Sequence, residues 1–153
     1  MYQGHNLRSR LGVVMVMFSA LLGIQSGILF LFVFHEQREY HSIVSGVSWP
    51  DLSIGMQTVI YGILKIVGGG FMAFGAGMAC LVFPIARGDN WARCCALCLS
   101  AFVWLPTLYA CFVFLDVNPA SNPPVLPALM MFLLPVAGTL LSYRPAISDP
   151  AET

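Results

Sequence analysis

The residue with the clearest potential for chemistry is Lys65, which stands in a long apolar stretch between Met56 and Phe83. An ammonium group is costly to place inside a bilayer, and a charged residue there commonly marks a functional site. Gln25 would lie at a similar depth in the first apolar stretch, and Tyr61 is one helical turn from Lys65. These residues could form a polar site within the membrane. The interpretation we favour is that Lys65 lies at the outer interface, where its ammonium reaches the headgroups.

A second polar group follows the first apolar stretch, at residues 35–41. If this segment is helical, His35 and Glu39 share a face, and His41 lies close by. Imidazole and carboxylate groups can bind a divalent metal ion or act as acid and base at the membrane surface. The same residues also suit the solvated end of a helix that crosses a bilayer, which is the interpretation we favour. The segment therefore offers metal candidates but does not require a metal or a cofactor.

The cysteines form a third group, because most of them come near the junction of the second and third apolar stretches. Cys95 and Cys98 make a C-x-x-C motif, and Cys80 would lie at a similar depth on the preceding helix. Thiols in this arrangement could bind a metal or exchange disulfides. Burial in an apolar helix disfavours the thiolate that either chemistry needs. We therefore interpret these cysteines as packing residues, with metal binding as the alternative.

The composition limits which elements could position these residues. Hydrophobic residues make up 58% of the 153-residue chain and charged residues 9%, and the mean hydropathy is +0.81. Soluble domains average about 25% charged residues. The formal net charge of zero gives no electrostatic basis for binding nucleic acid. These values exclude a water-soluble enzyme and a nucleic-acid-binding protein, and they predict one integral membrane domain whose surroundings are the lipid bilayer.

Four apolar stretches predict an all-α fold, an integral membrane four-helix transmembrane bundle. A helix needs about 20 apolar residues to cross a bilayer, and backbone exposed to lipid must satisfy its own hydrogen bonds. The single domain covers residues 1–153, with an extracytoplasmic loop at 35–53. We expect the helices at about residues 11–34, 54–84, 91–115 and 125–143.

The arginines outside these stretches are distributed unevenly. Five lie on one side of a four-span chain, and only Arg38 lies on the other. Because basic residues are enriched in cytoplasmic loops, the N- and C-termini are predicted to be cytoplasmic. The five arginines on that side are Arg8, Arg10, Arg87, Arg93 and Arg144.

Small residues at four-residue spacing occur in the first two predicted helices. In lipid, such faces let helix backbones approach closely. They could pack against each other within one chain, or serve a homo-oligomer or a larger membrane-protein partner. The predicted packing residues are Ser19, Gly23 and Gly27 in the first helix and Gly69, Ala73 and Gly77 in the second.

These features predict a non-enzymatic accessory subunit or scaffold that packs through glycine-rich helix faces. One alternative is a small transporter or channel component with a polar site at Lys65, Gln25 and Tyr61. A second is a membrane enzyme that uses residues 35–41. The stretch Gly-Asp-Asn-Trp-Ala-Arg from Gly88 to Arg93 is similar to sequences in four-span bacterial membrane proteins. That resemblance implies the bacterial inner (plasma) membrane and transfers no functional residue.

Overall fold

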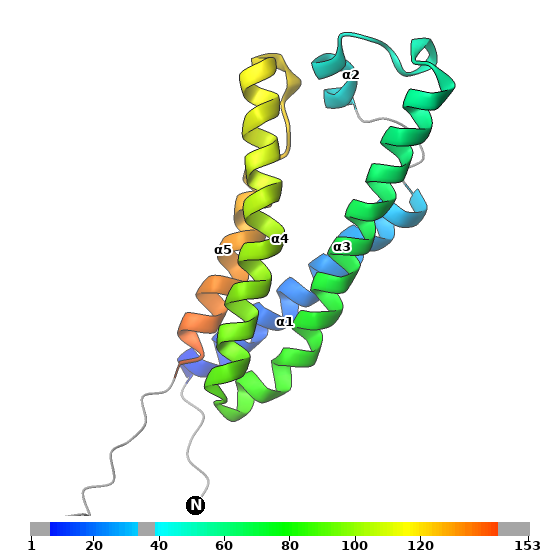
Figure 1. The fold of residues 1–153 in the computed structure, drawn as a ribbon. Helices are drawn as coiled ribbons and strands as arrows, with labels where there is room; N and C mark the ends of the chain where they lie inside the picture. Colours follow the sequence, from blue (N-terminus) through cyan, green and yellow to red (C-terminus); the bar gives the residue numbers. More distant parts are fainter. Residues whose placement is uncertain (1–6, 34–38, 144–153) are drawn as a thin grey trace, which may run out of the picture.

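A computed structural model gives the structure of residues 7–33 and 39–143, and every regular element in these ranges is helical (Figure 1). The prediction of an all-α fold is confirmed for this part of the chain. The π-helical turn η1 (Leu29–Val33) continues α1, and two short 3-10 turns are η2 (Trp49–Asp51) and η3 (Pro119–Ser121). The α-helices are α1 (Leu7–Ile28), α2 (Glu39–Ser45), α3 (Ile54–Arg87), α4 (Asn90–Val117) and α5 (Val125–Leu141).

Three helical segments are long and apolar enough to cross a membrane. They are Leu7–Val33, which joins α1 to η1, then α3 and α4. The remaining apolar helix, α5, has 17 residues and extends about 26 Å at the usual helical rise. The length and composition of the three long helices are those of an integral membrane protein.

The helix ends differ in places from the predicted ones. The second predicted helix, α3, continues through Pro84 to Arg87. A proline removes only one backbone hydrogen-bond donor from a helix, so the helix can continue for about a turn beyond the proline before it ends. The chain turns at Gly88, whose φ of 102° is left-handed and whose N–H donates to the carbonyl oxygens of Pro84 and Ile85. The predicted loop at 35–53 also contains α2 and η2.

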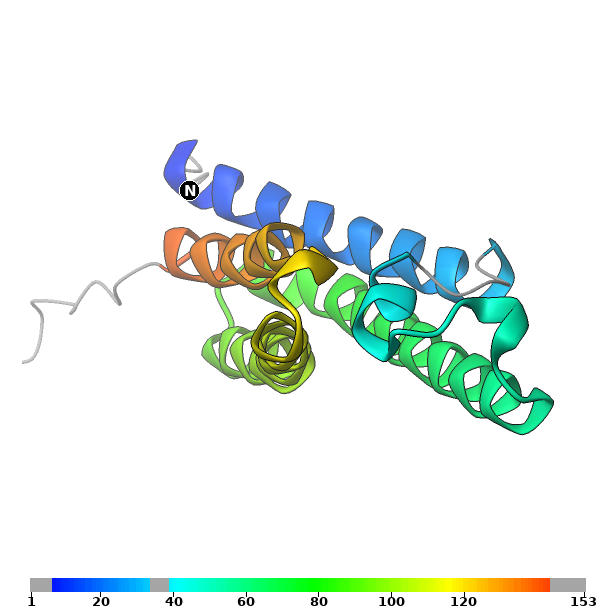
Figure 2. The same cartoon turned by 90° about the horizontal axis from the view of Figure 1, so that it is seen from above.

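The long helices diverge from a tight turn. α3 and α4 are closest near their junction at Gly88 and separate toward their other ends (Figure 1). α1 packs against both α3 and α5, and α5 packs against α4 (Figure 2). At the open end, α2 contacts η3, and the Asn118 side-chain amide donates to the Ile43 carbonyl oxygen at 3.2 Å. The short helix thereby attaches the 39–53 segment to the C-terminal end of α4.

The approach of α1 to α3 depends on glycines in both helices. A Cβ atom added to Gly75 would lie 2.5 Å from the Ile24 nitrogen, and one added to Gly27 would lie 2.7 Å from the Met72 nitrogen. A Cβ on Gly68 would lie 3.0 Å from the backbone of Leu31. Separations near 2.5 Å are shorter than real Cβ contacts. The two backbones can therefore come this close only where glycine removes the side chain.

A second glycine contact joins α1 to α5. A Cβ on Gly12 would lie 2.5 Å from the Gly138 carbonyl oxygen, and a Cβ on Gly138 would lie 2.8 Å from the Gly12 carbonyl oxygen. The contact is reciprocal, so the two helices touch backbone to backbone at this point. α1 thus packs through small residues on both neighbours, as helices in lipid commonly do.

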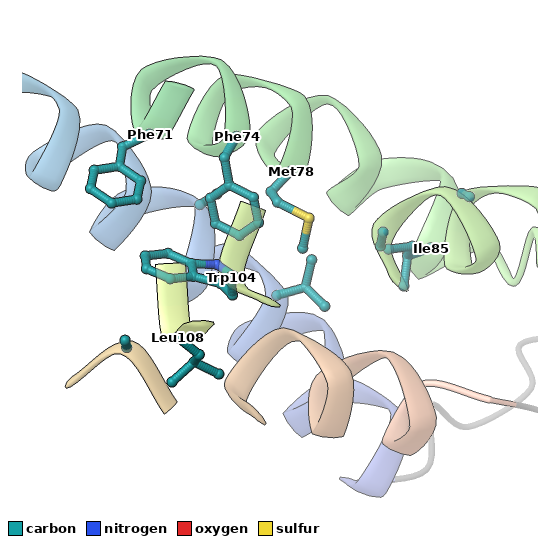
Figure 3. Close-up of a cluster of buried hydrophobic side chains, with 11 residues drawn as sticks. Phe71, Phe74, Met78, Ile85, Trp104 and Leu108 are labelled. Carbon is teal, nitrogen blue, oxygen red and sulfur yellow. The ribbon is translucent and has the colours of Figure 1, made fainter. Parts of the chain in front are cut away.

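Aromatic side chains fill the region between α3 and α4. Trp104 from α4 stacks on Phe71 with ring centroids 5.1 Å apart, and Phe74 meets the indole edge-on at 5.6 Å (Figure 3). Met78 and Leu108 are buried in the same cluster. Offset and edge-to-face ring pairs are both favourable. This cluster fixes how far apart α3 and α4 lie before they diverge.

Candidate functional site

Lys65 binds the π-helical turn at the end of α1. Its Nζ donates to the carbonyl oxygens of Leu31 and Phe30, the second at 3.4 Å, and lies 4.6 Å from the centroid of the Tyr61 ring. Carbonyl dipoles and the face of an aromatic ring both stabilise an ammonium ion. The structure therefore brings Lys65 and Tyr61 together, and it joins them to the backbone of α1.

Gln25 is not part of this group. It is exposed on α1, two residues from each of Gly23 and Gly27. Those glycines face α3, and two residues correspond to about 200° around a helix, so Gln25 lies on the opposite face. The structure does not bring Gln25 together with Lys65, because the two residues differ both in face and in level: Lys65 contacts Phe30 and Leu31, nearer the end of this helical segment.

Replacing Lys65 by methionine is expected to loosen the π-helical turn, because Phe30 and Leu31 lose their side-chain donor. Backbone amides in the peptide covering 29–33 should exchange with deuterium about tenfold faster, measured by mass spectrometry on the detergent-solubilised protein. Lys65→Arg keeps a charged donor and should exchange at the wild-type rate. Equal exchange in the wild type and Lys65→Met would contradict the role of this contact.

The most extensive buried polar contact involves Arg93, which is only 5% exposed. Its guanidinium donates to the Ser142 carbonyl oxygen at 2.8 Å and to the Gly88 carbonyl oxygen at 2.9 Å. It also donates to Asn90 Oδ1 at 2.6 Å and lies over the Tyr143 ring, 5.6 Å from its centroid. One side chain thus connects the start of α4 to the end of α5 and to the turn between α3 and α4.

The sequence interpretation used Arg93 only as a loop charge and missed this contact. A signal was present, because Arg93 lies in the first turn of α4, where the helix dipole disfavours a cation. Its guanidinium instead reaches the last carbonyls of α5, where the dipole favours a cation. The carbonyl that stabilises the Arg93 charge belongs to Ser142, 49 positions along the chain. Residue spacing within one helix cannot indicate such a partner.

The metal candidates are distributed over separate parts of the molecule. His35 lies outside the described residues, while Glu39 and His41 are residues of α2. Cys80, Cys95 and Cys98 are exposed on α3 and α4. Within the described ranges, no group of three or more histidine, cysteine or acidic residues could hold a metal ion.

The small-residue faces are only partly as predicted. On α1, the predicted residues Ser19, Gly23 and Gly27 are buried. On α3, the glycines that meet α1 are Gly68 and Gly75. Sequence spacing did not separate these faces, because glycines occur on several sides of α3. The predicted residues of α3 lie elsewhere: Gly69 and Ala73 are exposed, and Gly77 faces Leu99 of α4.

The described residues thus define an all-helical protein with three helices of membrane-spanning length, joined by glycine contacts and by the side chains of Lys65 and Arg93. Comparisons with protein-family models, with curated proteins and with solved structures found no match.

Proposed function

We propose that the chain is a multi-pass protein of a bacterial inner membrane, with four transmembrane helices and both termini in the cytoplasm, and that it acts as a non-enzymatic accessory subunit or scaffold. The exposed small-residue face of α3 carries this proposal. A helix of 34 residues that leaves small side chains uncovered is suited to receive another helix in lipid.

The surface supports placement in a bilayer. Large apolar side chains point outward along the long helices, including Phe102 at 79% exposure and Ile66 at 76%. Small residues such as Gly12, Ser19 and Gly23 are buried between helices. Contiguous apolar surface of this extent would be unstable in water. In this proposal α5 crosses the bilayer beside α1 and α4. Its 17 residues are extended by the flanking residues at each end.

Charge supports the proposed orientation. The arginines of the described residues all belong to helix ends that meet near the Gly88 turn. By the positive-inside rule, the arginine end is cytoplasmic. The arginines are Arg8, Arg10, Arg87 and Arg93.

We define the outward face of α3 as Gly69, Ala73, Ala76 and Cys80, all of which are exposed. A Cβ on Gly69 would meet nothing within 4 Å. The residues follow one another at intervals of four, three and four, which is the spacing of a helix–helix contact seam. Since α1 uses Gly68 and Gly75, this face remains available for a partner.

Replacing Ala73 by leucine should lower the amount of co-purifying partner at least tenfold, because the longer side chain prevents close approach of a helix. The measurement is the stoichiometry of the complex purified in mild detergent from native membranes. Ala110→Leu is the matched control, since Ala110 is exposed on α4 and lies outside the outward face of α3. A monomeric wild-type protein with enzymatic turnover would contradict the proposal, as would equal partner recovery in both variants.

The structure gives less support to the transport alternative. A transport site at Lys65 loses Gln25, and the Lys65 ammonium already contacts backbone carbonyls. The enzyme that would use residues 35–41 stays an alternative from the sequence, because His35 lies outside the described residues.

A further inference from the structure

Gln25 is a polar side chain on the outer side of α1. The exposed positions Leu11, Val14, Phe18, Leu21, Gln25 and Ile28 follow one another at alternating intervals of three and four. We call these residues the outer seam of α1. This alternation keeps side chains along one line of a helix and is the pattern through which two helices pack. Gln25 is the single polar member of the outer seam.

The amide of Gln25 lies at a depth where water cannot reach it. This argument rests on the bilayer placement in the proposed function. Gln25 is eight residues before Val33, or about 12 Å along the axis, and 14 residues after Leu11, or about 21 Å. The hydrocarbon core is about 30 Å thick, and the glutamine side chain is too short to reach either surface. No hydrogen bond joins Gln25 to another residue of the described ranges.

We propose that the outer seam of α1 pairs with the same seam of a second copy of this chain, through hydrogen bonds between the two Gln25 amides. A primary amide both donates and accepts, so it is complementary to itself. A twofold axis along the membrane normal places the two α1 helices side by side in the same orientation. Each Gln25 then meets its equivalent at equal depth.

The chemistry of the outer seam favours an identical partner over an unlike one. The outer seam carries no charge that would select an acidic or basic partner. Its other members are large and apolar, and they adapt to many neighbours. A single polar residue at a seam position fixes the register of two paired helices, and in an identical chain that register is matched automatically. The outer seam is also separate from the outward face of α3, so both can be occupied together.

The test measures self-association of the full-length chain in phosphatidylcholine vesicles, by energy transfer between donor-labelled and acceptor-labelled copies. The wild type should associate, and Gln25→Leu should raise the dissociation constant about threefold to tenfold. Gln25→Asn keeps an amide and should stay close to the wild type. Ala73→Leu, on the outward face of α3, should leave the energy transfer unchanged.

The outcomes separate this inference from the proposed function. Absence of transfer in the wild type, or equal transfer in Gln25→Leu, would overturn the pairing and leave the role of the outward face of α3 intact. Loss of transfer in Ala73→Leu but not in Gln25→Leu would assign self-association to α3 and also overturn it. Extraction of the native protein from membranes by alkaline washing would instead contradict the bilayer placement on which both depend.

Discussion

Replacing Gly75 by alanine is expected to destabilise the protein by about 1–3 kcal/mol, although alanine favours a helix more than glycine does. The added Cβ would lie 2.5 Å from the Ile24 nitrogen and 2.7 Å from the Ala20 carbonyl oxygen. Both are backbone atoms, so no rotamer change can relieve the overlap. The helices α1 and α3 would have to separate along their contact, which loses packing over several turns. The measurement is the free energy of unfolding in detergent micelles.

Gly70→Ala provides the matched control. Gly70 is in the same helix, and a Cβ there would meet nothing within 4 Å. Glycine costs roughly 1 kcal/mol relative to alanine inside a helix, so this substitution should leave the protein equally stable or more stable. The two variants share the change in helix propensity and differ in the contact alone. If both stabilise the protein, the close approach of α1 to α3 at Gly75 is contradicted.

The helical type of the apolar stretches could be predicted from the sequence, because it depends on properties averaged over many residues. Of the four predicted spans, three are helices of membrane-spanning length and the fourth, α5, has 17 residues. An apolar stretch such as that containing Phe71 and Phe74 has few ways to satisfy its backbone except as a helix. Single residues set the precise ends, and their effect depends on the conformation they adopt. The sequence predicts that α3 ends at about residue 84, whereas the helix continues to Arg87 and is followed by Gly88 in a left-handed conformation.

The faces of the helices were harder to predict than their existence. Gly68, Gly69 and Gly70 are consecutive and point in three directions, so spacing alone does not say which one meets α1. The choice depends on what α1 presents, including the bulk of Ile24 next to Gly75. A similar limit applies to Gln25, whose direction depends on which side of α1 is covered.

Replacing Arg93 by methionine is expected to destabilise the protein by about 3 kcal/mol. Methionine fills most of the same volume but donates no hydrogen bond. The carbonyl oxygens of Ser142 and Gly88 would both lose their donor at a site from which water is largely excluded. A buried acceptor left without a partner costs more than the net gain from making the bond. Unfolding in detergent micelles again gives the measurement.

Arg87→Met is the control that separates the effect of losing the Arg93 hydrogen bonds from the effect of losing a positive charge. Arg87 ends α3 near the same turn, is exposed, and lies over the Phe83 ring, 4.0 Å from its centroid. An exposed cation–π contact contributes about 0.5–1 kcal/mol, so the loss should be no larger than that. Both variants remove one positive charge from the same end of the bundle, so any effect on membrane orientation is shared.

Arg93→Lys tests whether the planar guanidinium itself is needed. Lysine keeps the charge, but a single ammonium cannot direct donors to Ser142, Gly88 and Asn90 together. Its stability should therefore lie between those of the wild type and Arg93→Met. Surface substitutions typically change the free energy of unfolding by no more than about 0.5 kcal/mol. If Arg93→Lys, Arg93→Met and Arg87→Met all unfold within that range of the wild type, then Arg93 does not hold α4 to α5. The close approach of Gly12 to Gly138 would then be the principal contact positioning α5 at this end of the bundle.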